Sequence, residues 1–105
     1  MAVEKNEFQI EEALFKKGAL VIRAINHKLR QQIMQAIHKK GRVAVTDIYV
    51  KLRLEQSVAS QHLAILRNGG FVKTEREGKQ IFYSVNYEKV QEVQRLADTI
   101  IQTSK

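Results

Sequence analysis

The sequence predicts a mainly α-helical domain that carries one β-hairpin. Three observations lead to this prediction. Apolar residues recur at helical spacing over most of the 105 residues, whereas two stretches on either side of Gly78 have the composition of β-strands. A short helix and a longer one are joined only by a tight turn at residues 53–55. Two helices joined by a tight turn and followed by a hairpin are the elements of a winged helix-turn-helix.

Length and composition indicate a single globular domain over residues 1–105. Hydrophobic residues make up 44% of the chain and charged residues 28%, which is ordinary for a folded protein. We find no apolar run long enough to cross a bilayer and no signal-peptide pattern, so we expect a cytoplasmic protein without a membrane partner. The chain has no cysteine, which excludes disulfides, thiolate catalysis and cysteine-based metal or redox sites.

The positive charge of the chain, +7 at neutral pH, is concentrated in its middle. Between Arg23 and Arg53, Asp47 is the only acidic residue. The basic residues of this segment are Arg23, Lys28, Arg30, Lys39, Lys40, Arg42, Lys51 and Arg53. A basic block in a small domain favours a polyanionic partner, nucleic acid first. A basic face that contacts only solvent is the alternative interpretation.

The two ends of the chain predict long amphipathic helices. The first helix is predicted over residues 7–25 and the last over residues 87–102, with Asn86 as the N-cap of the last. Their apolar residues cover more surface than one small core requires, which indicates contact with a second chain. We therefore expect a homodimer formed by these two helices. The residues predicted at its interface are Phe8, Leu14, Phe15, Val93, Ala97 and Ile100.

The helix-turn-helix is predicted over residues 46–68. Asn26 is expected to cap the helix that precedes this motif, and Gly41 is expected to end that helix. Asp47 then lies at the start of a short helix over residues 47–52, and the tight turn leads from it into the longer helix of the motif.

The longer helix of the motif, residues 57–68, has an apolar side and a small, neutral, polar side. The apolar side is formed by Ala59, Leu63 and Leu66. Ser57, Gln61, Ala64 and Asn68 lie on the other side. Such a side suits a DNA major groove, because a glutamine amide pairs with adenine N6 and N7 and small side chains let the backbone approach.

A hairpin wing is predicted over residues 71–85, with strands at residues 71–75 and 80–85. Basic side chains on either side of its turn suit contacts with the DNA backbone or the minor groove. Together the helix and the wing predict a set of DNA-contacting residues. These are Gln56, Ser57, Ser60, Gln61, His62, Arg67, Lys73, Arg76 and Lys79.

The segment VASQHLAILRNGGFV and the wing KTEREGKQIFYSV resemble the ArsR/SmtB family of winged-helix repressors. They are similar to the family patterns S-Q-H-L-x-x-L-R-x-x-G-L-V and R-x-G-x-x-x-x-Y. The resemblance covers about residues 26–85. It implies a transcriptional regulator, usually a repressor, that binds a palindromic operator in double-stranded DNA as a homodimer. It also implies that the protein releases the operator when an effector binds to the protein.

The chain departs from the family pattern where many members bind metals. Ala44 and Thr46 lie at the two cysteine positions of a family motif similar to E-L-C-V-C-D-L, and the last helix has no histidine. We therefore expect no metal site and no cofactor. Thiophilic metal ions and mild oxidants are not expected to release this protein from DNA. An effector, if one exists, is expected to be a small molecule or a partner protein.

The histidines and tyrosines carry weaker signals. His27 and His38 are expected on the surface, because neither has cysteine or clustered acidic residues near it in the sequence. His62 is expected to bond a DNA phosphate or a neighbouring backbone group rather than a metal ion. Tyr83 and Tyr87 are expected to pack against the protein rather than to stack on bases.

Three other classes of function are alternatives to specific DNA binding. The sequence has no nucleophile–base pair and no glycine-rich phosphate loop, so we do not expect an enzyme. Winged helices also serve as protein-interaction adaptors, and this alternative stays open. Non-specific binding of nucleic acid also stays open, although the aromatic residues fall mostly at apolar-face positions, which argues against an RNA-stacking surface.

Overall fold

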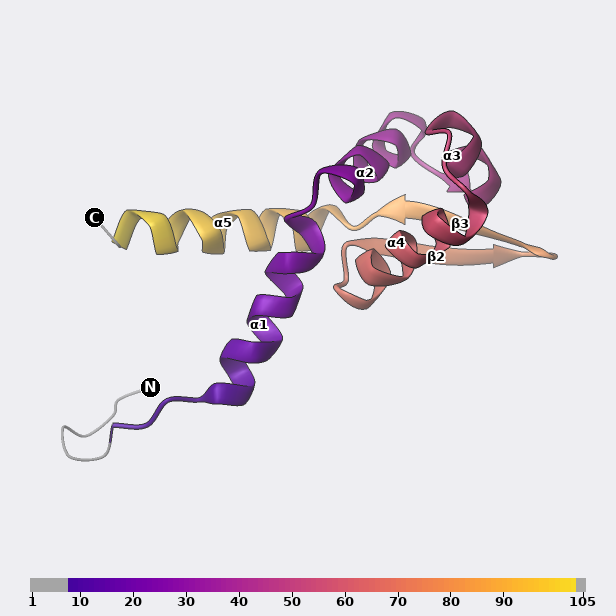
Figure 1. The fold of residues 1–105 in the computed structure, drawn as a ribbon. Helices are drawn as coiled ribbons and strands as arrows, with labels where there is room; N and C mark the ends of the chain where they lie inside the picture. Colours follow the sequence, from indigo (N-terminus) through magenta and orange to yellow (C-terminus); the bar gives the residue numbers. More distant parts are fainter. Residues whose placement is uncertain (1–7, 104–105) are drawn as a thin grey trace.

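The computed structural model describes residues 8–103 of the chain. Its elements confirm the predicted order of helix, helix, short helix, turn, helix, hairpin and helix (Figure 1). They are α1 (Glu12–Ile25), α2 (Lys28–Lys40), β1 (Val43–Ala44), α3 (Val45–Lys51), α4 (Gln56–Asn68), β2 (Val72–Glu77), β3 (Gln80–Val85) and α5 (Tyr87–Thr103).

The hairpin belongs to a three-stranded antiparallel sheet of order β1-β3-β2. The additional strand β1 pairs Val43 with Tyr83 and Ala44 with Phe82. Sequence reasoning missed it because a two-residue strand is too short to show a period of two. Gly78 has a φ of +60° at the first position of the two-residue loop between β2 and β3, a position that favours glycine in hairpin turns.

The hydrophobic core lies between α2, α3, α4 and the inner face of the sheet. The predicted apolar side of α4 is confirmed, because Ala59, Leu63 and Leu66 are fully buried. Phe71 is also fully buried, although it lies just before β2 rather than within it. The other large fully buried side chains are Ile33, Ile37 and Ile48. Met34 is buried with them, and burial of this apolar surface holds α4 against the domain.

The first two helices begin later than the sequence predicted. Helix α1 begins at Glu12, so Phe8 precedes the helix, and the predicted start at Glu7 lies outside the described residues. The predicted cap of α2 was wrong. Asn26 ends α1 by donating its backbone N–H to the carbonyl of Ile22, and His27 is the N-cap of α2. His27 has an extended backbone, and its Nδ1 accepts the backbone N–H of Arg30.

Helix α3 begins two residues before the predicted start at Asp47. It runs from Val45 to Lys51, directly after β1. The residue at its N-cap position, Ala44, is held extended by its pairing with Phe82 in β3. The start of α3 is therefore determined by sheet pairing rather than by a capping side chain. At the far end of the chain Asn86 caps α5 as predicted, because its Oδ1 accepts the backbone N–H of Lys89.

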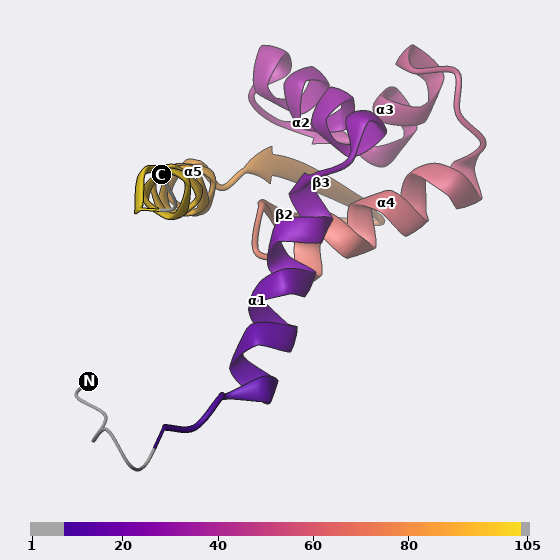
Figure 2. The ribbon, with the colours of Figure 1, turned by 60° about the vertical axis from the view of Figure 1, so that its left-hand side comes forward.

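Helices α1 and α5 project from the body of the molecule. Figures 1 and 2 show the two helices leaving the globular part in different directions, with the N-terminal end of α1 far from the other helices. The radius of gyration is 17.0 Å, whereas a compact chain of this length has about 13 Å. The two helices that were predicted to contact a second chain are therefore the parts that extend beyond the compact body.

Candidate nucleic-acid interface

Helix α4 presents its small, neutral side to solvent. Ser57, Ser60 and Gln61 are exposed, and so is Gln56, the first residue of the helix. Glu55, the residue before Gln56, has an extended backbone, and its side chain does not cap the helix. Because Glu55 does not cap the helix, the first backbone N–H groups of α4 have no side-chain partner. The arrangement can offer hydrogen-bond donors and acceptors to base edges at little steric cost.

His62 and Arg67, the remaining predicted contacts of α4, lie in different environments. Arg67 is exposed in the last turn of the helix. His62 is half-buried, and its ring lies 5.0 Å from the ring of His27, centroid to centroid. His27 is also half-buried, so its predicted position on the surface was only partly right. The fold brings together two of the three histidines that are scattered in the sequence.

Arg30 connects this histidine pair to α1. Its side chain is the only buried charged one among the described residues, with 7% of its surface exposed. Its Nε donates to the carbonyl of Ala24 at 2.6 Å and its Nη2 to the carbonyl of Arg23 at 3.1 Å. Its Nη1 lies 3.3 Å from Nδ1 of His62. Burial lowers the pKa of His62, and the nearby His27 and Arg30 lower it further.

The wing divides its charged residues between two faces. Residues of β2 alternate, so Arg76 lies on the same face as Thr74 and its partner Tyr83, which packs on the core as predicted. Lys73 lies on the other face, with Glu75 and Glu77. The structure therefore does not bring Lys73 and Arg76 together, although the sequence grouped them. Lys79 is exposed in the loop at the tip of the wing.

Arg42 neutralises the acidic face of the wing. Its Nη2 lies 2.9 Å from Oε1 of Glu75 and 2.7 Å from Oε1 of Glu77. Its guanidinium carbon lies 3.9 Å from the centroid of the Phe82 ring, a cation–π contact. Arg42 belongs to the basic block of the sequence, yet its charge is paired within the protein. No local pattern predicts this pairing, because 33 positions separate Arg42 from Glu75.

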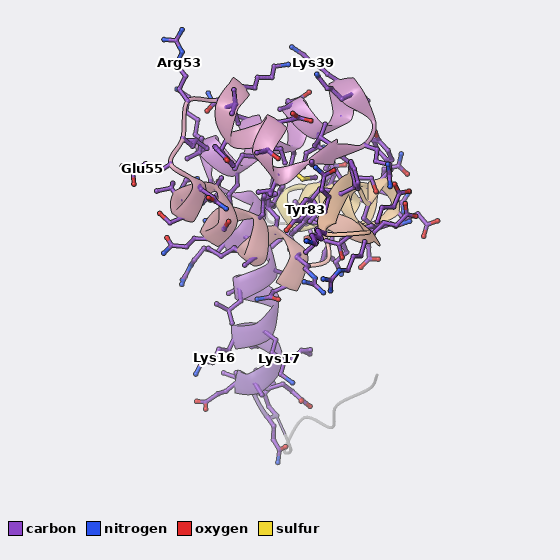
Figure 3. All side chains as sticks on the ribbon, turned by 90° about the vertical axis from the view of Figure 1, so that its right-hand side faces the viewer. Lys16, Lys17, Lys39, Arg53, Glu55 and Tyr83 are labelled. Carbon is purple, nitrogen blue, oxygen red and sulfur yellow. The ribbon has the colours of Figure 1, made fainter. Side chains whose placement is uncertain are left out.

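Four cations of the basic block line an open groove of about 650 Å³ between α2 and the end of α3. The groove is lined by Lys28, Gln31, Gln32, Gln35, Ala36, Lys39, Lys51, Leu52 and Arg53. Among the residues that the structure describes, no carboxylate lines it. Arg53 has a φ of +56°, a left-handed backbone conformation that is unfavourable for residues other than glycine. Figure 3 shows Arg53 and Lys39 extending outward from this side of the molecule.

The terminal helices expose most of the apolar residues that were predicted at a dimer interface. Phe8, Leu14 and Phe15 are at least 67% exposed, and Ile100 is 53% exposed. Ala97 is half-buried. Val93, in contrast, is buried in the core of its own chain. A groove of about 500 Å³ lies between α1 and α5. It is lined by Leu14, Phe15, Gly18, Ala19, Val21, Ile22, Lys89, Glu92, Val93, Leu96 and Ile100.

The expectation that Tyr87 packs against the protein is met in part, because its ring lies edge-on to the ring of His38. The Tyr87 ring is half-exposed at the start of α5, and its hydroxyl lies 2.7 Å from Nδ1 of His38. His38 is exposed as predicted. In the described part of the chain no three histidine or carboxylate side chains converge as metal ligands. None of the helices within residues 8–103 has the length and hydropathy needed to cross a membrane.

Comparison with known proteins gives one family and several relatives. Residues 27–74 match the model of the bacterial regulatory proteins of the arsR family. The transcriptional repressor PagR of Bacillus anthracis is 33% identical to this chain, over 90% of the chain and 94% of PagR. The transcriptional activator HlyU of Vibrio cholerae is 31% identical over 70% of the chain and 68% of HlyU.

Solved structures agree with these sequence matches. The homodimeric winged helix-turn-helix DNA-binding domain of a possible ArsR-family regulator from Mycobacterium bovis superposes with a TM-score of 0.71 at 27% identity. That superposition covers 97% of this chain and 91% of the domain. The crystal structure of PagR superposes with a TM-score of 0.64 at 32% identity, over 83% of this chain and 99% of PagR.

Proposed function

We propose that this chain, which belongs to the ArsR family of DNA-binding transcriptional regulators, binds a palindromic operator as a homodimer and represses transcription there. One observation carries the proposal. The exposed side of α4 consists of neutral polar and small side chains, while the apolar side of the same helix is fully buried. A rigid helix that presents serine and glutamine to solvent is suited to reading base edges in the major groove.

In the proposed interface, α4 reads the bases and the wing supplies affinity for the DNA backbone. Gln61 pairs with an adenine, and Ser57 and Ser60 bond base edges or nearby phosphates. The cations of the wing, Arg76 and Lys79, attract the DNA backbone without reading sequence. Because Lys73 lies on the face of β2 that carries two glutamates, we assign it a smaller part than Arg76.

The exposed apolar surface of α1 and α5 supports the homodimer. These helices project beyond the body and expose large apolar side chains, among them Leu14, Phe15 and Leu96. Exposed apolar surface of this extent favours association. A twofold axis through these helices would repeat α4, and a pair of recognition helices related in this way reads an inverted repeat.

Repression is the simpler outcome for a small dimer bound at an operator, because it excludes other proteins from that DNA. PagR, a relative that aligns over most of both chains, is a repressor, whereas HlyU is an activator. A small molecule or partner protein bound at the groove between α1 and α5 would act as effector by changing how the two copies of α4 are spaced.

Selection of bound sequences from a random duplex pool tests the proposal. We expect an inverted repeat whose half-sites are about 10 base pairs apart, centre to centre. Binding to the selected duplex should fall steeply as salt rises, since counterions are released from the DNA. Enrichment of no sequence together with a steep salt dependence would indicate non-specific binding. Absence of both would indicate a protein-interaction adaptor.

A further inference from the structure

Arg30 lies where α1, α2 and α4 meet, and its side chain contacts both of the other helices. Two of its donors bond the carbonyls of Arg23 and Ala24 in the last turn of α1. A third lies at hydrogen-bond distance from His62 in α4. Its backbone N–H also lies 3.4 Å from Nδ1 of His27, the N-cap of α2. A single residue therefore joins the end of the proposed dimerisation helix to the proposed recognition helix.

The chemistry of these contacts determines where the imidazole protons lie. A guanidinium and a backbone N–H only donate hydrogen bonds. Nδ1 of His62 and Nδ1 of His27 must therefore both accept, and the proton of each neutral ring lies on Nε2. Because the ring of His62 is only half-buried, its Nε2–H is left to bond a group outside the cluster.

A purely structural role does not explain why a charged residue is buried at position 30. Its guanidinium is buried, and no carboxylate within residues 8–103 forms an ion pair with it. Its charge is balanced instead by two carbonyls at the C-terminal end of α1, where the helix dipole is negative. A buried charge is seldom the most stable way to fill a core, since an apolar side chain avoids the cost of removing the charge from water.

We propose that Arg30 is a positioning residue for DNA binding. It holds His62 as a neutral ring with the proton on Nε2, so that α4 presents this N–H to a phosphate of the DNA backbone, and it ties that ring to the end of α1. The proposal rests on the proposed function. His62 lies on the flank of the helix beside the side formed by Ser57 and Gln61, which suits a contact with the backbone rather than with a base.

The surroundings of His62 keep its ring neutral. The titratable and charged groups that face it are Arg30 and His27, and neither is an acid that would stabilise an imidazolium. From α1 only the carbonyls of Arg23 and Ala24 reach the cluster. Burial lowers the pKa of His62, and the charges of His27 and Arg30 lower it further, so the neutral ring predominates at neutral pH. A proton on Nδ1 would remove the acceptor that Arg30 needs.

The tautomer of His62 is measured in the protein without DNA. Nitrogen-15 chemical shifts of the imidazole at pH 7 distinguish Nε2–H, Nδ1–H and the doubly protonated ring. We expect the Nε2–H tautomer in the wild type and a mixture of the Nε2–H and Nδ1–H tautomers in Arg30→Met. An Nδ1–H or protonated ring in the wild type, or an unchanged tautomer in Arg30→Met, would overturn the proposal.

A double-mutant cycle on the selected duplex tests the role in binding. His62→Ala should weaken binding by about tenfold, the usual effect of losing a hydrogen bond to a charged group. Arg30→Met should weaken binding by a similar factor in the wild type but by much less in the His62→Ala background. Equal losses in both backgrounds would mean that Arg30 does not act through His62.

Two further variants separate positioning from folding and from charge. His62→Gln places an amide N–H near the position of Nε2 and has no tautomer to set, so it should retain binding and should make binding insensitive to Arg30→Met. Arg23→Met removes the same charge from a residue that contributes only its carbonyl to the cluster, and it should leave the tautomer of His62 unchanged. If Arg30→Met does not fold, Arg30→Leu, which also lacks a donor, takes its place, with the same expected change of tautomer.

The two levels of the proposal fail in different ways. If the wild type selects no duplex, the proposed function fails while the tautomer measurement still reports on Arg30. If the wild type selects an inverted repeat but the cycle is additive, the role of Arg30 fails and the proposed function stands.

Discussion

Gly69 lies so close to Phe71 that a Cβ atom on Gly69 would come within 3.0 Å of two atoms of the phenyl ring. The same atom would lie 3.2 Å from the Cβ of Ala24 in α1. Both neighbours are buried, with Phe71 fully enclosed. Neither has room to move away, so the end of α4 packs against α1 only because residue 69 has no side chain.

We predict that Gly69→Ala destabilises the protein by about 1–3 kcal/mol, the usual cost of overpacking a core. Urea unfolding at a fixed protein concentration measures it. Asn68→Ala is the matched control, because Asn68 is the exposed neighbour in the same helix and its replacement should change stability little. Equal stability of Gly69→Ala and the wild type would contradict the packing described for this helix end.

Arg53→Gly should stabilise the folded domain by roughly 0.5–1 kcal/mol, because a left-handed backbone strains every residue except glycine. The same change removes one cation from the groove between α2 and α3, so binding to random DNA should weaken and its salt dependence should become shallower. Urea unfolding and a salt titration measure the two effects. A loss of stability would show that the side chain of Arg53 contributes more than its backbone strain costs.

Gln61→Ala should weaken binding to the selected operator by about 1–3 kcal/mol and binding to random DNA much less. Lys79→Ala should weaken both alike and lower the salt slope by about one unit. Gln61 is exposed on the polar side of α4, and Lys79 lies at the tip of the wing. Fluorescence anisotropy with both duplexes compares the two variants. If Gln61→Ala weakens binding to both duplexes equally, Gln61 does not read a base.

Removal of Arg42 should expose the negative charge of the wing. In Arg42→Met the carboxylates of Glu75 and Glu77 lose their partner, so binding to DNA should weaken at low salt. Because these ion pairs are exposed, unfolding stability should change by less than about 1 kcal/mol. In the converse variant, Glu75→Gln with Glu77→Gln, DNA binding should strengthen. Binding that is unchanged in both variants would place this face of the wing away from the DNA.

Phe15→Asp should convert the proposed homodimer into monomers, because a carboxylate would then lie in the apolar groove between α1 and α5. Sedimentation at micromolar concentration measures the oligomeric state. Val50→Asp is the control, since Val50 is also an exposed apolar residue, 66% exposed, but lies on α3. A wild type that sediments as a monomer at every concentration would refute the homodimer.

Much of the architecture of this protein follows from local patterns. The apolar residues of α2, α4 and α5 repeat at helical spacing, so their existence and their buried sides were predictable without a structure. The buried side of α4, with Ala59 and Leu63, is an example, and burial of that side left its polar side as the candidate interface. The turn at Gly78 and the cap at Asn86 were also predictable, because each depends on the chemistry of a residue within its own segment.

The remaining features depend on residues that are distant in the chain. Strand β1 exists only because Val43 and Ala44 pair with β3, and the start of α3 follows from that pairing. His27 rather than Asn26 caps α2, since α1 uses Asn26 for its own end.

The charges were distributed by the fold rather than by the composition. Arg42, counted with the basic block, pairs with carboxylates of β2, and Arg30, from the same block, is buried against His62 of α4. The helices and the hairpin follow from the sequence alone, because periodicity and turn chemistry act over a few residues. Only the tertiary structure decided which charges face solvent and which histidines meet, because those contacts join side chains 32 or more positions apart.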